Sequence, residues 1–314
     1  YQKVVQYEPE NLLIHYELNK LKNEKINSNL KDKIEKVIKV KNSTKTNLAY
    51  GHFLLSKYEY QLKNYEKEFN HLLRGHELYF SSLNSNDKKS VNYWLDELPK
   101  IKELVNIDKN FKKANNKIKP IFIIGVPRCG STLVEKIITS CPKSIPMGEE
   151  TGVFSLLMWN QIWKKKNLVF NIENIKVDLI EKYKEKKLIQ KKSNYIFTDK
   201  SLENFFYLGL INKIFPEAKV INCKRNALSS IMSIFKRNLG DIIWAHNLDN
   251  IFKYFDIYNR LTENYKKLFP NFIYELYYEK LVNDPEIESK KLLNFCNLPW
   301  DIKCLEFYKR KDLI

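Results

Sequence analysis

Apolar residues in the first third of the chain recur at the 3.6-residue spacing of an α-helix. The clearest examples form two groups: Leu12, Leu13, Tyr16, Leu18 and Leu21, then Phe53, Leu54, Tyr58, Tyr60 and Leu62. Each group places its apolar side chains on one face of a helix, where neighbouring helices can bury them. The pattern predicts an all-α region over residues 1–117, which ends in a polar linker rich in Lys and Asn that begins at Asn106.

The hydrophobic pattern changes after residue 117. Residues 120–125 form a short, wholly apolar run that is typical of a buried parallel strand, and a helical pattern follows over residues 132–140. Further strands are predicted at residues 195–197, 219–223 and 272–276. Because strands alternate with helices, residues 118–314 are predicted to form a three-layer α/β domain with a central parallel sheet, whose ligands lie at the carboxyl ends of the strands.

The net charge of the chain bears on which ligands and macromolecules it can bind. The 314 residues include 54 Lys and Arg against 37 Asp and Glu, which gives a formal net charge of +17. All but six of the basic residues are Lys, spread along the whole sequence, as on a solvated surface, and no nucleic-acid-binding motif accompanies them. We therefore expect no nucleic-acid partner, although the excess charge favours anionic ligands. Because Arg is rare in this chain, an Arg inside a motif indicates a site that needs a planar, bidentate hydrogen-bond donor.

Cysteine usage and the chain ends bear on the compartment. The five Cys show no CxxC spacing, so we expect buried free thiols in a reducing compartment, no metal site and a cytoplasmic protein. No apolar run reaches the ~18 to 20 residues of a membrane span. The chain opens at Tyr1 without Met and stops at Ile314, so we expect a fragment that is truncated at its C-terminus, and an upstream targeting segment stays open.

Half of the chain's eight glycines lie between Gly125 and Gly152. The first of them open a strand-to-helix turn, residues 125–132, which reads Gly-Val-Pro-Arg-Cys-Gly-Ser-Thr. Backbone N–H groups and the positive helix end cradle a phosphate at such a turn. Compared with the triphosphatase pattern GxxxxGK[ST], Ser131 takes the place of the Lys, while Arg128 projects from the loop. The turn predicts a bound phosphate and disfavours a P-loop kinase.

The loop and the strand before it resemble the 5′-phosphosulfate loop of sulfotransferases that use 3′-phosphoadenosine 5′-phosphosulfate (PAPS). Further motifs of these enzymes are matched in order, at residues 148–151, 198–200, 215–225, 278–285 and 298–300. Upstream, residues 49–76 resemble the helix-turn-helix of a tetratricopeptide repeat, with an ordinary helical subdomain as the alternative. The resemblance is to the bacterial tetratricopeptide-repeat-linked sulfotransferases and to the tyrosylprotein sulfotransferases, and it implies a P-loop-like α/β fold and a PAPS-dependent enzyme.

The resemblance also implies which residues bind the donor. The loop residues that would hold its 5′-phosphate are Arg128, Cys129, Gly130, Ser131 and Thr132. Cys129 replaces the family's usual Ser or Thr, which removes one hydroxyl donor but keeps the backbone cradle. Lys200, directly after a predicted strand, matches the lysine that stabilises the departing phosphate. Arg225 and Ser233 match the pair that binds the 3′-phosphate.

The acceptor must lose a proton, and a carboxylate in a partly dry cleft suits this task. The resemblance favours Glu150 as the general base. Two alternatives stay open: that Glu149 is the base, and that neither acid is. His246 is a further candidate, for which a structural role is the competing interpretation. The predicted catalytic residues are thus Glu150, Lys200 and Arg128, without a metal ion.

The acceptor itself is open. The resemblance implies a hydroxyl group, with peptidyl tyrosine as one candidate, and the positive charge is compatible with an acidic peptide or protein. Residues 164–166, three consecutive Lys, either attract such an acceptor or form a solvated turn. A second hypothesis is a helical-repeat interaction protein, whose helical region binds a protein partner and whose nucleotide-binding domain is inactive.

Overall fold

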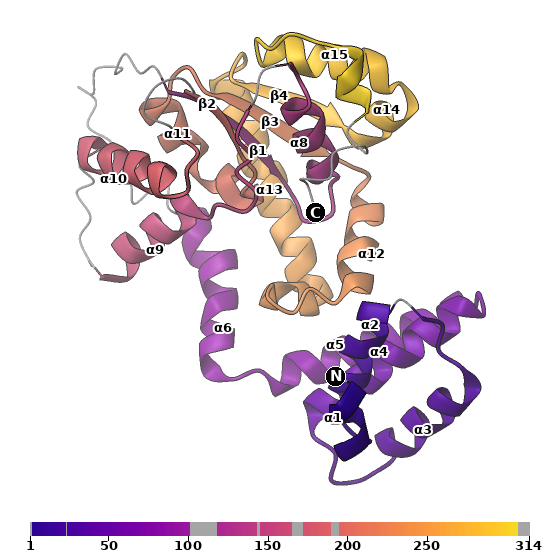
Figure 1. Cartoon of the computed structure of the whole chain (residues 1–314). Coiled ribbons are helices and arrows are strands. Elements are labelled where there is room, and N and C mark those ends of the chain that lie inside the picture. Colours follow the sequence, from indigo (N-terminus) through magenta and orange to yellow (C-terminus); the bar gives the residue numbers. More distant parts are fainter. Residues whose placement is uncertain are drawn as a thin grey trace. The chain divides into compact units, whose positions relative to one another are not determined.

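The structure of the chain, a computed structural model, describes residues 2–22, 24–100, 118–142, 145–164, 172–189 and 195–306 (Figure 1). It divides into two compact units. We call Tyr1–Leu95 with Ile231–Lys253 the helical unit, and Asp96–Ser230 with Tyr254–Ile314 the α/β unit. The domain boundary predicted at residue 117 lies outside the described residues, as do the lysines at 165 and 166 and the chain from residue 307 onward.

The helical unit begins with a run of helices, as the apolar periodicity predicts. They are α1 (Gln2–Tyr7), α2 (Leu12–Lys22), α3 (Ser28–Ile38), α4 (Lys45–Gln61), α5 (Tyr65–Ser82) and α6 (Ser85–Asn92). The π-helix η1 (Tyr93–Glu97) crosses into the α/β unit, where the short 3-10 helix η2 (Leu98–Lys100) follows. The side chains of Asn27, Thr44 and Asn64 accept hydrogen bonds from backbone N–H groups in the first turns of α3, α4 and α5. These caps fix where each helix starts.

Helices α4 and α5 form the helix-turn-helix predicted over residues 49–76, which is confirmed. Glycine lets the helices approach closely. A Cβ on Gly75 would lie 2.7 Å from the ring of Phe53, and one on Gly51 would lie 2.7 Å from Leu12 and 2.6 Å from Ile38. The assignment of this hairpin to the tetratricopeptide repeats stays a prediction.

Residues 231–253 complete the core of the helical unit with a histidine pair. His76 of α5 stacks on Phe235 of α12 (Ala227–Arg237), and its Nδ1 lies 3.0 Å from Nδ1 of His246 in η4 (Ile243–His246). Nε2 of His76 lies 2.8 Å from the Phe235 carbonyl, which can only accept, so this nitrogen carries a proton. Nδ1 of neutral His76 is therefore an acceptor, and neutral His246 has one proton for two contacts, with this nitrogen and with the Leu239 carbonyl 3.3 Å from its Nε2.

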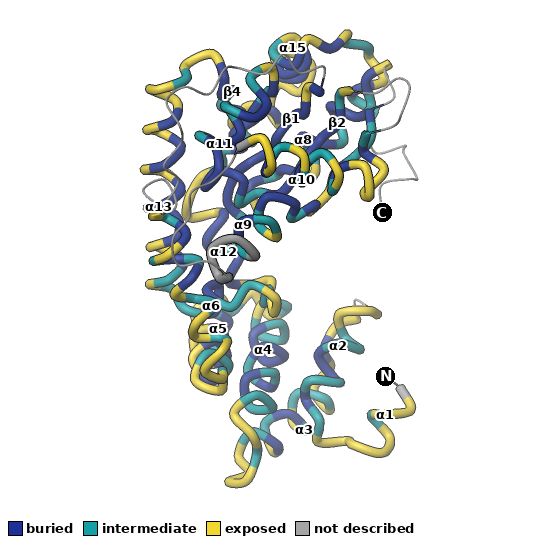
Figure 2. Tube along the Cα trace, turned by 90° about the vertical axis from the view of Figure 1, so that its left-hand side faces the viewer, coloured by how far each residue is buried: buried dark blue, intermediate teal, exposed yellow. Residues whose placement is uncertain are grey.

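A four-stranded parallel sheet forms the centre of the α/β unit. Its strands are β1 (Lys119–Gly125), β2 (Ile196–Asp199), β3 (Lys219–Lys224) and β4 (Ile273–Tyr277), in the spatial order β2-β1-β3-β4. The strands predicted from the sequence are confirmed. Every residue of β1 after Lys119 is buried, and this strand runs in dark blue in Figure 2. Because all strands are parallel, their carboxyl ends meet at one edge.

Helices cover both faces of this sheet. Neighbouring side chains of a strand point to opposite faces, and on β2 Thr198 meets Glu135 of α8 (Ser131–Thr139), whereas Phe197 meets Tyr183 of α10 (Ile172–Glu185). Helix α15 (Pro285–Phe295) packs beside α8. The face of α10 also carries α9 (Val153–Lys164), η3 (Leu202–Tyr207), α11 (Leu208–Ile214) and the α/β-unit part of α13 (Leu248–Leu268). The predicted α/β fold with a central parallel sheet is confirmed; α14 (Tyr278–Asn283) and η5 (Ile302–Leu305) complete it.

Three general expectations can be compared with the described residues. All five Cys are free and buried, as predicted. Within the described ranges, no helix is long and apolar enough to cross a bilayer. In the same ranges, no three His, Cys, Asp or Glu side chains come together as ligands for a metal ion.

Candidate active site

The loop between β1 and α8 has the backbone of an anion cradle. Gly130 precedes α8 in the left-handed conformation, at φ 93°, and a Cβ there would lie 2.4 Å from the ring of Tyr278. Glycine is thus required both by the backbone angle and by the close approach of Tyr278. Because Gly130 has no side chain to cap the helix, the first N–H groups of α8 are free of a side-chain cap. A helix start of this kind attracts phosphate or sulfate.

The side chains of the loop point in different directions. Arg128 and Thr132 are exposed, whereas Cys129 and Ser131 are buried. Cys129 reaches inward to Cys223 at the end of β3, and a hydrogen bond between the two thiols lowers the pKa of Cys129, with Ser131 contributing in the same direction. The hydroxyl of Thr132 therefore stays at the surface of the cradle, while Cys129 anchors the loop to the sheet.

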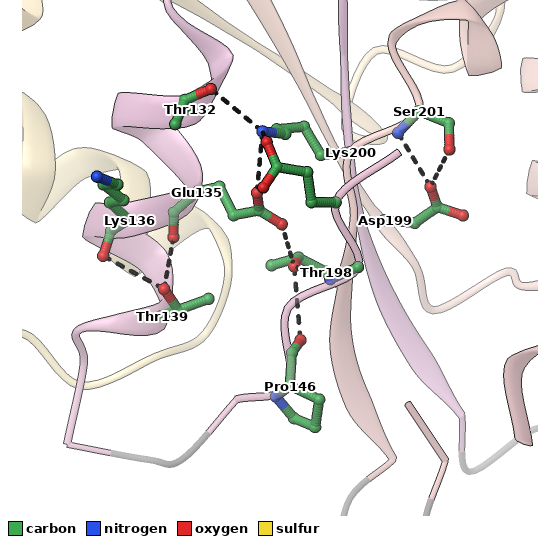
Figure 3. A network of polar contacts seen from close by, with 11 residues as sticks. Thr132, Glu135, Lys136, Thr139, Pro146, Thr198, Asp199, Lys200 and Ser201 are labelled. Carbon is green, nitrogen blue, oxygen red and sulfur yellow. Dashed lines mark hydrogen bonds and ion pairs between the residues drawn. The ribbon is translucent and has the colours of Figure 1, made fainter. Parts of the chain in front are cut away.

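Lys200 lies at the centre of a polar network at the end of β2 (Figure 3). Its side chain is only 4% exposed. Its ammonium donates to Oγ1 of Thr132 at 3.1 Å, forms a short ion pair with Glu149, and lies 3.3 Å from Oε2 of Glu135. The structure therefore brings Lys200 and Thr132, two of the predicted donor-site residues, into direct contact.

The segment before the two candidate acids runs along the edge of β2. The amide of Lys200 donates to the Gly148 carbonyl at 2.8 Å, and the amide of Gly148 donates to Oγ1 of Thr198 at 3.0 Å. The approach is so close that a Cβ on Gly148 would lie 2.1 Å from the Thr198 carbonyl oxygen. Backbone pairing thus fixes the acid-bearing turn to the strand that carries Lys200.

The two candidate acids occupy different environments. Glu149 pairs with Lys200, yet 57% of its side chain is exposed. Glu150 is exposed and has a left-handed backbone, at φ 45°. Among the described residues, it makes no hydrogen bond or ion pair with a protein group. The structure therefore places both acids beside the lysine network, and the choice between them stays a prediction.

Asp199 secures the other side of this turn. It is fully buried and accepts hydrogen bonds from Tyr183 at 2.5 Å, from Thr151 at 2.9 Å and from the Ser201 hydroxyl at 2.8 Å. Burial raises the pKa of Asp199, and these hydrogen bonds oppose the rise. Because Thr151 directly follows Glu150, Asp199 holds the acid turn in place from within the core.

Arg225 completes the edge of the sheet at β3. Its Nη1 donates to the Arg128 carbonyl at 3.0 Å, and its guanidinium lies 4.7 Å from the centroid of the Tyr278 ring. A pocket of about 380 Å³ opens beside it, lined by residues of the loop, β3, β4 and α13, including Val126, Lys224 and Asn259. The structure thus brings Arg225 to the phosphate loop, and its role at a 3′-phosphate stays a prediction.

Two predicted residues belong to the helical unit. Ser233 lies on α12 beyond the point at which the chain enters that unit, so its pairing with Arg225 stays a prediction. His246 is 1% exposed, and burial lowers its pKa to about 4. It is a partner of His76 inside the helical core, which agrees with its structural interpretation.

Three residues of the site received no role from the sequence: Glu135, Asp199 and Tyr278. Asp199 and Tyr278 lie inside motifs that were matched, but a motif gives no hydrogen-bond partners. Glu135 follows Thr132 by three positions, a spacing that places both on the same face of α8. This spacing was the only available signal for Glu135.

Comparisons with known proteins address the family. The sulfotransferase family profile matches residues 120–302. An uncharacterized protein of Aquifex aeolicus is 31% identical over 286 residues, which cover 84% of this chain and 36% of that protein. Protein-tyrosine sulfotransferase 1 of Danio rerio is 28% identical over 205 residues, which cover 59% of this chain and 55% of that enzyme. The chain thus spans about a third and about half of these relatives.

Solved structures are similar at lower identity. The sulfotransferase domain from the Synechococcus PCC 7002 olefin synthase aligns with a TM-score of 0.45 and 19% identity, covering 65% of this chain and 83% of that domain. The sulfotransferase domain from the curacin biosynthetic pathway aligns with a TM-score of 0.45 and 16% identity, covering 63% and 80%. The family match extends over more than half of the chain and includes the phosphate loop, Lys200 and Arg225, and this chain belongs to the sulfotransferase family.

Proposed function

We propose that this chain transfers a sulfuryl group from PAPS to a hydroxyl acceptor. The observation that carries the proposal is the contact of Arg225 with the backbone of the phosphate loop. It adds a further cationic group, beside Arg128 and Lys200, to the anion cradle at the start of α8, which suits a donor with phosphates at two positions. Family membership supports the sulfuryl group as the one transferred.

The residues present fit such a donor. The amides of residues 128–132 and the Thr132 hydroxyl would hold the 5′-phosphate, and Arg128, which is exposed, would face the phosphosulfate. Arg225 would bind the 3′-phosphate together with Ser233, and the neighbouring pocket would take part of the nucleoside. Cys129 faces inward, so its replacement of the usual hydroxyl leaves the cradle intact.

The proposed reaction is an in-line displacement at sulfur. The acceptor oxygen forms a bond to sulfur while the bond from sulfur to the bridging oxygen breaks, and the acceptor proton passes to a carboxylate. Glu150 would take this proton because it is exposed and has no protein cation to neutralise it, whereas Glu149 already faces Lys200. Lys200 would stabilise the negative charge that develops on the departing phosphate.

Peptidyl tyrosine in an acidic sequence is our candidate acceptor. Relatives of this chain are named protein-tyrosine sulfotransferases, and a formal net charge of +17 favours an acidic partner. A cytoplasmic location and a protein partner for the helical unit accompany this proposal as hypotheses.

Donor binding tests the proposal first. Calorimetry should show that the protein binds 3′-phosphoadenosine 5′-phosphate more tightly than ADP. Arg225→Ala should weaken the former about tenfold to hundredfold, because a charged hydrogen bond contributes roughly 1.5–3 kcal/mol. Arg74→Ala is the matched control, since Arg74 is exposed on α5 in the helical unit. Equal or tighter binding of ADP would contradict the proposed donor, and binding of neither nucleotide would favour the helical-repeat interaction protein.

Paired acid variants test the base. Glu150→Gln should keep nucleotide binding and lose sulfuryl transfer by roughly 10²–10⁴-fold, the usual contribution of general base catalysis. Glu149→Gln should lose less, because it removes a partner of Lys200 but leaves the base. Transfer is measured with labelled PAPS and a panel of acidic tyrosine peptides. Normal transfer by Glu150→Gln together with loss in Glu149→Gln would assign the base to Glu149.

A further inference from the structure

Glu135 is a carboxylate without access to solvent in the middle of the candidate site. It lies on α8, its side chain is 0% exposed, and its Oε1 accepts a hydrogen bond from Thr198 at 2.7 Å. Its Oε2 has no hydrogen-bond partner in the described chain, but lies 3.3 Å from the ammonium of Lys200. Burying a carboxylate in this way costs desolvation free energy unless a cation lies beside it. Lys200 is the cation that offsets this cost for Glu135.

The contacts of Glu135 favour its ionised form. Its Oε1 accepts a hydrogen bond from the Thr198 hydroxyl and its Oε2 faces an ammonium, so each oxygen has a donor beside it. Burial raises the pKa of Glu135, and the hydrogen bond from Thr198 and the charge of Lys200 oppose this rise. A neutral side chain of similar shape would pack here without that cost. The retained charge therefore calls for a role.

Glu135 also connects the three parts of the site (Figure 3). It belongs to the helix that follows the phosphate loop, and it contacts both Thr198 and Lys200 at the end of β2. Thr198 in turn accepts a hydrogen bond from the amide of Gly148, directly before the acids. A single buried carboxylate thus fixes the loop helix, the lysine strand and the acid turn relative to one another.

Lys200 has two carboxylate partners that differ in their freedom to move. Glu149 is 57% exposed, so a bound anion can displace it from the ammonium into solvent. Glu135 has no exposed surface and cannot leave. The groups that face Lys200 are Glu135 and Thr132 from α8, Glu149 from the acid turn and, through its electrostatic influence, the Cys223 thiol of β3. Only Glu135 offers a permanent negative charge.

We propose that Glu135 is the positioning residue of Lys200: it holds the ammonium at Thr132 and remains beside it as a counter-charge after the donor has displaced Glu149. The inference rests on the proposed function, because it assumes that an anionic donor enters beside Thr132. Glu135 touches neither donor nor acceptor, and it acts through Lys200. Its loss should therefore change the rate of transfer more than the affinity for the nucleotide.

Glu135→Gln is the primary test, because glutamine keeps the shape and the acceptor for Thr198 but removes the charge. We expect kcat to fall roughly 10- to 100-fold, as for a misplaced catalytic group, and the dissociation constant of 3′-phosphoadenosine 5′-phosphate to change less than about threefold. Lys136→Gln, one position along α8, is the matched control.

A second readout is independent of activity. The NMR resonance of the Lys200 Cε, assigned by its loss in Lys200→Met, should shift in Glu135→Gln relative to the wild type, because the ammonium loses the carboxylate beside it. Thr198→Val serves if Glu135→Gln fails to fold: it keeps the charge beside Lys200, so this resonance should stay close to its wild-type position while kcat falls. An unchanged kcat and an unchanged Lys200 resonance in Glu135→Gln would overturn the inference. If the wild type binds the nucleotide but transfers nothing, the proposed function fails, and the Lys200 resonance still tests the role of Glu135.

Discussion

All five histidines of the chain belong to the helical unit, whereas the carboxylates whose pKa is raised by burial belong to the α/β unit. Burial lowers the pKa of every histidine, to about 3 for His76 and to about 4 for His246. In the α/β unit, burial raises the pKa of Glu135, Asp199 and Glu203. Folding thus favours the loss of protons from the histidines of the helical unit and the binding of protons by these carboxylates of the α/β unit.

This difference in buried groups distinguishes the helical unit, which is a scaffold, from the α/β unit, which carries the candidate site. In the helical unit, His76 and His246 form a neutral pair whose Nδ1 atoms lie 3.0 Å apart, and they stack on Phe235 and Tyr79. In the α/β unit, Glu135 stays charged because Lys200 is beside it. A neutral pair needs only its own partner, whereas a buried charge needs an opposite charge at a fixed place. The helical unit also buries one carboxylate, Glu68, which pairs with Lys236 at 2.7 Å, but the buried pair of the α/β unit lies within the candidate site.

Acid should expose the largest difference between the units. A histidine whose folded-state pKa lies below the unfolded value of 6.5 lets the unfolded chain bind more protons, so stability is full above pH 6.5 and falls as the pH drops toward the folded value. At about 1.4 kcal/mol per pH unit and group, His76 and His246 together should cost the helical unit on the order of 4 kcal/mol by pH 5. Hydrogen exchange, corrected for its intrinsic pH dependence, should show lost protection in α4 and α5.

The α/β unit should keep its protection over the same range. Its buried carboxylates have raised pKa values, so they contribute stability at low pH that is lost as the pH rises through the folded-state pKa. Glu275, whose pKa two lysines lower against the effect of burial, matters only below about 4.5. His246→Gln should reduce the acid response of the helical unit. Equal loss of protection in β1 and α5 at pH 5 would contradict the comparison.

Replacing a glycine by alanine should give the second-largest difference in stability between the two units. Gly148→Ala places a Cβ 2.1 Å from the Thr198 carbonyl oxygen, a backbone atom that cannot rotate away, so we expect a loss of about 3 kcal/mol or more and a displaced acid turn. Gly51→Ala in the helical unit meets only the ends of Ile38 and Leu12. The gain in helix propensity of about 1 kcal/mol offsets part of that crowding, so its net cost should be about 1 kcal/mol. Urea unfolding measures both, and equal costs would remove the distinction.

Removing a buried hydroxyl group should give the smallest difference in unfolding free energy between the two units. Tyr258 donates to Oδ1 of Asn222 at 2.5 Å, which links α13 to β3, so Tyr258→Phe leaves a buried amide oxygen unpaired and should cost about 1–2 kcal/mol. Ser56 donates to the Phe53 carbonyl within its own helix. Ser56→Ala should change the unfolding free energy by roughly 0.5 kcal/mol or less, since that carbonyl keeps its helical role. A larger effect for Ser56→Ala in urea unfolding would reverse the ranking.

The sequence predicts the elements of this fold better than the contacts between them. The apolar run 120–125 and the later strands are recognisable because a buried parallel strand has a local signature. The contacts of the site are not local. Glu135 meets Thr198, and Tyr183 meets Asp199, across elements that only the folded chain brings together. The histidine pair was likewise beyond the sequence, because His76 and His246 come from distant segments.

The order of segments along the chain has a consequence for its biosynthesis. Strand β1 cannot pair with β3 until the ribosome has passed Lys224, and β4 is completed only at Tyr277. The helical unit also waits, because its histidine core needs residues 231–253. At about 5–20 residues per second, nascent β1 presents an unpaired apolar edge for several seconds. Newly made chains should therefore depend on chaperones that shield extended apolar segments, and slower translation between β1 and β3 should lower the yield of folded protein.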